Sequence, residues 1–138
     1  MIRVIMGRPL LISLVALVAV VAAFWVAEGV AHMATSLAVT KTADTNDGVC
    51  DADCSLREAI DAAVNGDTIN IPPGVYTVTT TLVIGKDLTL VGALSASTII
   101  QAAESPGVAS HSVFSIDSGK VVAASYVTIQ HGGSSGIV

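Results

Sequence analysis

The 138-residue chain has few charged and few aromatic residues: 12% are Asp, Glu, Lys or Arg, and 4% are aromatic. Its net charge of −5 excludes an ordinary nucleic-acid-binding protein, because the chain lacks the cations that neutralise a run of phosphates. Its hydrophobic content of 52% excludes intrinsic disorder, because disordered chains are poor in apolar residues. What remains is a chain with room for one folded domain.

The longest uncharged stretch is close to the N-terminus, where residues 10–27 are almost entirely apolar and follow Arg3 and Arg8. Basic residues, an apolar run and then small residues are typical of a secretory signal peptide. The run is also long enough to cross a bilayer, so residues 1–34 are either a cleaved signal or an uncleaved membrane anchor. Both interpretations predict an exported protein, secreted or held at the cell surface, that meets a membrane only through residues 10–27.

Cys50 and Cys54 are the only cysteines. An even number of closely spaced cysteines in an exported chain favours a disulfide across a small loop. A zinc site is the weaker interpretation, because two further ligands would be needed and no histidine lies at the spacing of a zinc finger. A redox-active pair more often has the spacing C-x-x-C. We therefore predict a structural disulfide between Cys50 and Cys54.

Residues 55–66 have the pattern of one short helix. Ser55 and Glu58 have the spacing of a capping box, in which each side chain accepts a hydrogen bond from the other residue's backbone amide. The helix is expected to continue to Val64 and to end at Gly66, which suits a left-handed C-terminal cap. A helix this short needs an apolar surface to pack on. Its own apolar face is expected to consist of Leu56, Ile60, Ala63 and Val64.

The rest of the chain is rich in short β-branched runs bounded by turn-forming residues. Runs this short suit a solenoid, in which each coil stacks brief strands on the coil before it, and residues 69–89 are one expected coil. A small barrel or a sandwich is the alternative, although sandwich strands are usually longer. The predicted strands are residues 37–42, 68–71, 75–78, 82–84, 88–91, 98–100, 113–116 and 127–129.

Residues 54–60, Cys-Ser-Leu-Arg-Glu-Ala-Ile, closely resemble the CSLREA motif of exported bacterial proteins, and the flanking residues 39–48 and 62–76 agree with that family. The resemblance implies an all-β fold, a right-handed parallel β-helix of the pectin lyase-like type, preceded by the hydrophobic signal or anchor helix. It implies that the motif lies at the N-terminal end of the solenoid. A short α-helix there would cover the exposed apolar end of the first coil. The residues expected to build this cap are Ser55, Leu56, Arg57, Glu58 and Ile60.

The expected organisation has three parts. Residues 1–34 are the signal or anchor, residues 35–66 hold the N-terminal strand, the acidic cysteine loop and the capping helix, and residues 67–138 form coils of the β-helix. The sequence stops at Val138 where another turn and strand are expected, and no C-terminal cap is recognisable. We expect truncation of a longer solenoid; the alternative is self-association through the uncapped end.

The loop that precedes the helix is acidic. Calcium prefers carboxylate and carbonyl oxygens, so a calcium site is one interpretation of the loop, and no other cofactor is expected. A solvated acidic turn is the other interpretation, because the spacing departs from that of an EF-hand. The oxygens concerned belong to Asp44, Asn46, Asp47, Asp51 and Asp53.

Catalysis is not evident in the chain. Glycoside hydrolysis needs two carboxyl groups that face one sugar, and lyase chemistry needs a base among acidic groups. The strand region has no arginine and no dense acid pair. It offers only scattered groups, namely Asp67, Lys86, Asp87, Glu104, His111, Asp117, Lys120 and His131.

Exposed Thr and Ser side chains on the strands favour a different role, because they can hydrogen-bond a polysaccharide or a host-surface glycan. Tyr76 and Tyr126 are the only tyrosines that can stack on sugars. We therefore expect an exported structural or adhesive β-helix protein with no nucleic-acid partner. The alternative is the N-terminal fragment of a pectin lyase-like polysaccharide lyase or hydrolase whose active-site coils are missing.

Overall fold

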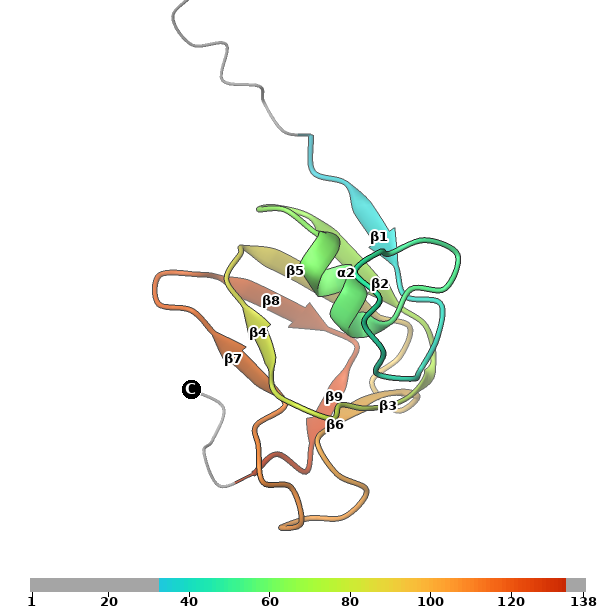
Figure 1. Cartoon of the computed structure of the whole chain (residues 1–138), viewed down its shortest axis with the longest axis vertical. Helices are drawn as coiled ribbons and strands as arrows, with labels where there is room; N and C mark the ends of the chain where they lie inside the picture. Colours follow the sequence, from blue (N-terminus) through green and yellow to red (C-terminus); the bar gives the residue numbers. More distant parts are fainter. Residues whose placement is uncertain (1–32, 134–138) are drawn as a thin grey trace, which may run out of the picture. The chain divides into compact units, whose positions relative to one another are not determined.

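A computed structural model of the chain describes residues 33–133, which form nine short strands in parallel sheets and one helix (Figure 1). The expected signal or anchor run, residues 10–27, lies outside the described residues. Among residues 33–133 no helix is long and apolar enough to cross a membrane.

The largest sheet, called the first sheet here, contains four parallel strands in the order β1-β2-β5-β8. These are β1 (Ser36–Ala38), β2 (Thr68–Ile71), β5 (Leu88–Gly92) and β8 (Val122–Ser125). The register stacks similar side chains in two rows across β1, β2 and β5. One row is Leu37, Ile69 and Leu90, and the other is Ser36, Thr68 and Thr89. Such in-register stacking is typical of parallel strands that belong to successive coils.

The other strands form two smaller parallel sheets. The second sheet has the order β3-β6-β9, and the third pairs β4 with β7. Because the strands enter the first, second and third sheets in that order and then repeat it, the chain passes all three sheets in each cycle (Figure 1). The bounds are β3 (Gly74–Thr77), β6 (Thr98–Gln101), β9 (Thr128–Gln130), β4 (Leu82–Ile84) and β7 (Phe114–Ile116).

The core lies between the sheets and is almost entirely aliphatic. Alternate strand residues are buried, as the period of two in a β-strand requires. Tyr76 is the only aromatic side chain among the fully buried residues that the structure describes, and its hydroxyl donates to the Pro72 carbonyl at 2.9 Å. The largest buried aliphatic side chains belong to Ile69, Ile71, Leu82, Ile84, Leu90 and Ile100.

The only helix among the described residues, α2 (Leu56–Ala62), begins as the sequence predicts and ends earlier. The Ser55–Glu58 capping box is present, and α2 packs against β2 (Figure 1). The helix ends before Val64, with Ala63 as an extended C-terminal cap. Val64 is therefore exposed rather than part of the buried face. Gly66 does adopt a left-handed conformation, at φ 91°, but in the turn that follows the helix.

The eight predicted strands are confirmed in place, and the structure has nine, with two corrections to the prediction. The first strand covers only Ser36–Ala38, because the backbone from Thr40 onward turns to bond Cys54 instead of extending a sheet. Strand β8 was missed, since Val-Ala-Ala-Ser has weak intrinsic β-propensity and is held by its pairing with β5. Other strand ends shift by one residue.

Candidate functional site

The acidic loop of residues 43–54 folds back onto α2 and is joined to it by covalent and polar contacts. Cys50 and Cys54 form the predicted disulfide. The backbone of Cys54 is fixed independently, because its amide donates to the Thr40 hydroxyl at 2.7 Å and its carbonyl accepts from the Thr40 amide at 2.8 Å. The disulfide therefore anchors the loop to a position that is already rigid.

Glu58 is the most deeply buried acid of this region, with 1% of its surface exposed. Its carboxylate accepts from the backbone amides of Ser55 at 2.6 Å and Asp47 at 3.1 Å, and Lys41 lies 3.6 Å away. The Ser55 amide is the main cause that lowers the pKa of Glu58 to about 2; burial opposes this shift, and the Asp47 amide and Lys41 add to it. Glu58 is thus a buried anion that ties the loop to the first turn of α2.

Arg57 and Asp44 form a second tie. The guanidinium makes two hydrogen bonds to the Asp44 carboxylate, at 2.9 and 2.8 Å, and donates to the Thr80 carbonyl at 2.9 Å. Asp44 also accepts from the amide and hydroxyl of Thr79, both at 2.7 Å. Burial favours a higher pKa for Asp44, but the Arg57 and Thr79 contacts outweigh it and lower the pKa. This pair joins the loop, the helix and the turn between β3 and β4.

Lys86 bonds the C-terminal end of α2, a contact that the sequence did not predict. Its ammonium donates to the carbonyls of Ile60, Asp61 and Ala63, at 2.9, 2.6 and 2.6 Å. These carbonyls lie at the C-terminal end of α2, where a cation is favourable and the carbonyls lack helical partners. No spacing in the sequence points to this contact, because Lys86 reaches the helix from the turn after β4.

The five candidate calcium ligands do not converge on one point. Among residues 33–133 no group of three or more His, Cys, Asp and Glu side chains is placed to hold a metal ion. The oxygens of this loop bond to neighbours instead: Asn46 to Gly48, Asp47 to Val49, and Asp51 to Asp53. Asp53 pairs with Lys41 at 3.0 Å, and Asp44 pairs with Arg57. The loop is thus organised by turn contacts and ion pairs.

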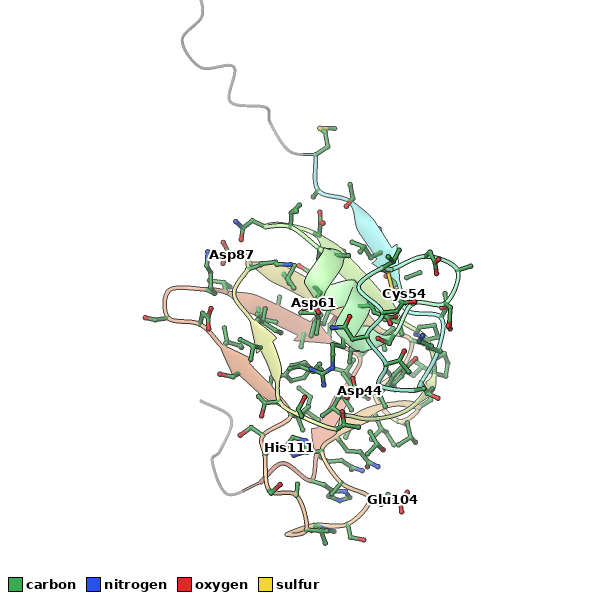
Figure 2. The ribbon with its side chains drawn as sticks, viewed as in Figure 1. Asp44, Cys54, Asp61, Asp87, Glu104 and His111 are labelled. Carbon is green, nitrogen blue, oxygen red and sulfur yellow. A yellow bond between two sulfur atoms is a disulfide. The ribbon has the colours of Figure 1, made fainter. Side chains whose placement is uncertain are left out.

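Asp67, Asp87, His111 and His131, four titratable groups of the strand region, are engaged in structural contacts. Asp67 is buried and accepts from the amides of Thr35 and Val64. Asp87 accepts from the Val121 amide, and His111 and His131 bond backbone carbonyls. Figure 2 shows Glu104 far from Asp61 and Asp87.

The outer faces of the sheets have a different character, because no described strand contains a charged residue. The outward rows of the first sheet consist of small and polar side chains, among them Ser36, Thr68, Asn70 and Ser125. A shallow groove of about 220 Å³ runs along the ends of β1, β2 and β5. Its lining consists of Ala38, Asn70, Ile71, Pro72, Val91, Gly92 and Ala93.

A second groove, of about 240 Å³, lies beside β9. It is lined by Ser112, Val113, Ile129, Gln130, His131, Gly132 and Gly133. His131 contributes one imidazole, whose Nδ1 is 3.1 Å from the Ala103 carbonyl. This groove holds a single titratable side chain among the residues that line it, so it lacks the paired groups of an acid–base site.

Comparison with known proteins gives one match. A family model described as rhamnogalacturonase A/epimerase, pectate lyase-like, matches residues 37–130. No curated protein and no solved structure matches the chain. The matched residues include strands β2 to β9, the helix with its cysteine loop, and all of β1 except Ser36.

Proposed function

The chain belongs to the rhamnogalacturonase A/epimerase, pectate lyase-like family, and we propose that it is an exported structural or adhesive protein that binds polysaccharide without cleaving it. The single observation that carries the proposal is the separation of charge from the sheets. Every acid and base of the described part lies in the helix or in a connection, and the outer faces of the strands are uncharged.

The proposal also includes a specific fold, in which the three parallel sheets form a β-helix. Three sheets visited in a repeating order, with in-register stacking, are what a right-handed parallel β-helix would give. The resemblance of residues 54–60 to the CSLREA motif supports the same fold, with α2 as its N-terminal cap. The buried bonds of Glu58, Arg57 and Lys86 are consistent with a cap that has no catalytic task.

The proposed location outside the cytoplasm is supported by the cysteine chemistry. The Cys50–Cys54 bond belongs to an oxidising compartment, since cytoplasmic thiols are kept reduced. The apolar run 10–27 after two arginines supports export as a signal or an anchor.

Protease shaving and surface labelling of intact cells, followed by mass spectrometry of the envelope and the medium, test the location. A chain found only in the cytoplasm with reduced cysteines would overturn it. Binding without cleavage is tested by affinity electrophoresis in gels that contain polysaccharide, together with an assay for newly formed reducing ends. The expected result is retardation in the gel with no new reducing ends.

An enzyme that acts on polysaccharides is the second candidate, and the description of the matched family favours it. Release of reducing ends or of unsaturated sugars by the native protein would establish this candidate and overturn the non-catalytic role.

A further inference from the structure

Tyr126 is an aromatic residue in an unusual position at the surface. It directly follows β8 and has a left-handed backbone, at φ 56°, which is uncommon for a residue other than glycine. Tyr126 is 63% exposed, whereas the other tyrosine of the chain, Tyr76, is 3% exposed. The backbone thus turns from the first sheet toward the second and leaves an aromatic side chain in solvent.

The position of Tyr126 is fixed relative to the groove of the first sheet. Its carbonyl lies against Gly92, at 2.1 Å from where a Cβ on Gly92 would be, so the two backbones are in close contact. Gly92 and Ala93 line the groove, and Leu94, which is 62% exposed, follows them. The backbone of Tyr126 therefore lies next to Gly92 at one end of this shallow, mainly apolar groove, and the Tyr126 side chain is exposed there.

Polar side chains lie along the same groove on the outer face of the sheet. Ala38, Asn70, Val91 and Ser125 are neighbours in one row across the four strands. The Asn70 amide donates to the Ser36 hydroxyl, and both side chains are exposed. Asn70 and Ser125 are the hydrogen-bonding side chains of this row, and they lie two strand spacings, about 10 Å, apart because Val91 is between them.

The lack of charge on this surface favours neutral glycans over acidic ones. The chain has a net charge of −5, but none of the groove residues, their row neighbours or Tyr126 is charged. An acidic polysaccharide would find no cation there and would meet a protein of its own sign. A neutral glycan suits an uncharged groove with an amphipathic ring at its end, because a tyrosine offers an apolar face together with a hydroxyl.

We propose that this groove and Tyr126 form a binding site for a neutral glycan, with the Tyr126 ring stacked on one sugar and the Asn70 and Ser125 side chains bonded to its neighbours. The inference rests on the proposed function and adds the location of the site and the class of ligand. Because the site uses no titratable side chain except the Tyr126 hydroxyl, it binds without cleaving.

The test compares two variants of the full chain. Tyr126→Asn removes the ring, while asparagine tolerates the left-handed backbone that Tyr126 adopts, so the fold is preserved. His131→Asn is the matched control, since His131 also has a left-handed backbone, at φ 51°, and lies outside the proposed site. Affinity electrophoresis is run with a soluble unbranched glucan and, separately, with polygalacturonate. Thermal melts show that each variant is folded.

The expected result is glucan binding that is roughly tenfold weaker in Tyr126→Asn and unchanged in His131→Asn. Equal glucan binding by Tyr126→Asn and the parent chain would overturn the site and leave the proposed function standing. Binding to polygalacturonate alone would overturn the neutral ligand in the same way. Binding to neither polysaccharide by the parent chain would count against both the site and the proposed function.

Discussion

Gly92 is the residue at which the first sheet leaves least room for a side chain. A Cβ at this position would lie 2.1 Å from the Tyr126 carbonyl oxygen and 2.7 Å from a methyl group of Val127. The first of these neighbours is backbone, which cannot move without displacing the turn between β8 and β9. The absence of a side chain is therefore required by packing rather than by the backbone conformation of Gly92.

We expect Gly92→Ala to lower the free energy of unfolding by about 1–3 kcal/mol, the usual cost of overfilling a packed site. Gly132→Ala is the control, because the nearest atom to its Cβ would be the Val113 amide nitrogen at 3.7 Å. The control is expected to change stability by no more than about 0.5 kcal/mol. Urea unfolding measures the free energy of unfolding of both variants. An equal decrease in the two would contradict the packing argument.

Glu58 makes stability depend on pH in the acid range. Its pKa is about 2 in the folded protein, against an ordinary value of 4.5, because the Ser55 and Asp47 amides bond the ionised form. A pKa lowered by folding gives stability that is fully present above pH 4.5 and is lost as the pH falls toward 2. Above this range the contribution is constant.

We therefore predict that the urea midpoint of the parent chain falls between pH 4.5 and pH 2.5 more steeply than that of Glu58→Gln. The variant loses the charge and keeps the size of the side chain. Its own slope reports the remaining acids, including Asp44, whose pKa is also lowered. Parallel slopes in the two proteins would show that folding does not change the pKa of Glu58.

At the scale of elements, α2 is too short to be stable alone and depends on contacts at both ends. Its N-terminus has the capping box, and its C-terminus is held by Lys86. Lys86→Met keeps the length of the side chain but removes three charge-assisted hydrogen bonds. We expect a loss of about 1–2 kcal/mol in the free energy of unfolding, measured in urea at neutral pH.

Lys120→Met is the matched control for the Lys86 prediction, because Lys120 lies in a turn away from α2 and its substitution removes the same charge. It is expected to change stability by no more than about 0.5 kcal/mol. A loss in the control equal to that of Lys86→Met would mean that net charge, and not the helix contact, is responsible.

The disulfide closes a very short loop, with a sequence separation of 4. The chain-entropy relation gives about 2 kcal/mol for a loop of this size, below the value for long loops. We predict that Cys50→Ser/Cys54→Ser remains folded and loses about that amount, because Cys54 keeps its backbone bonds to Thr40. Unfolding of the double variant in the absence of urea would show that the disulfide is essential to the fold.

Contacts between residues close in the sequence can be predicted from it, whereas contacts between distant segments cannot. Ser55 and Glu58 are local in the chain, so their capping box is visible as a spacing. The contacts of Lys86 and the Arg57–Asp44 pair join distant segments, and only the folded chain brings them together. The candidate calcium loop shows both cases. Asn46, Asp47 and Asp51 accept from amides two residues away. Asp44 and Asp53, in contrast, pair with cations that only the folded chain brings near.

Strand β8 illustrates the limit for the fold itself. Its alanines contribute little strand preference, and it forms because β5 offers a paired edge. The register of β2 on β5, in contrast, follows from repeating apolar residues that the sequence displays. The exposed ring of Tyr126 could not be predicted, because its left-handed backbone is set by the turn between two sheets.

Burial is uneven across the described part as a whole. The inward side chains of β2, β4 and β5, such as Ile69, Leu82 and Leu90, are at most 3% exposed. Those of β7, β8 and β9, among them Phe114 and Ile129, are only partly buried. In a stack of coils each coil gains stability mainly from its neighbours, so coils that bury less should open more easily.

Hydrogen exchange of the native protein tests this gradient. We predict that amides of β2 and β5 exchange only by global unfolding, whereas those of β8 and β9 exchange by local opening at lower free energy. The distinction is made by adding low urea, which accelerates global exchange and leaves local exchange nearly unchanged. Glu58→Gln serves as the control, because weakening the contacts of α2 should accelerate exchange in β2 more than in β9. Equal protection of β2, β5, β8 and β9 would mean that residues 33–133 unfold as one cooperative unit despite their uneven burial.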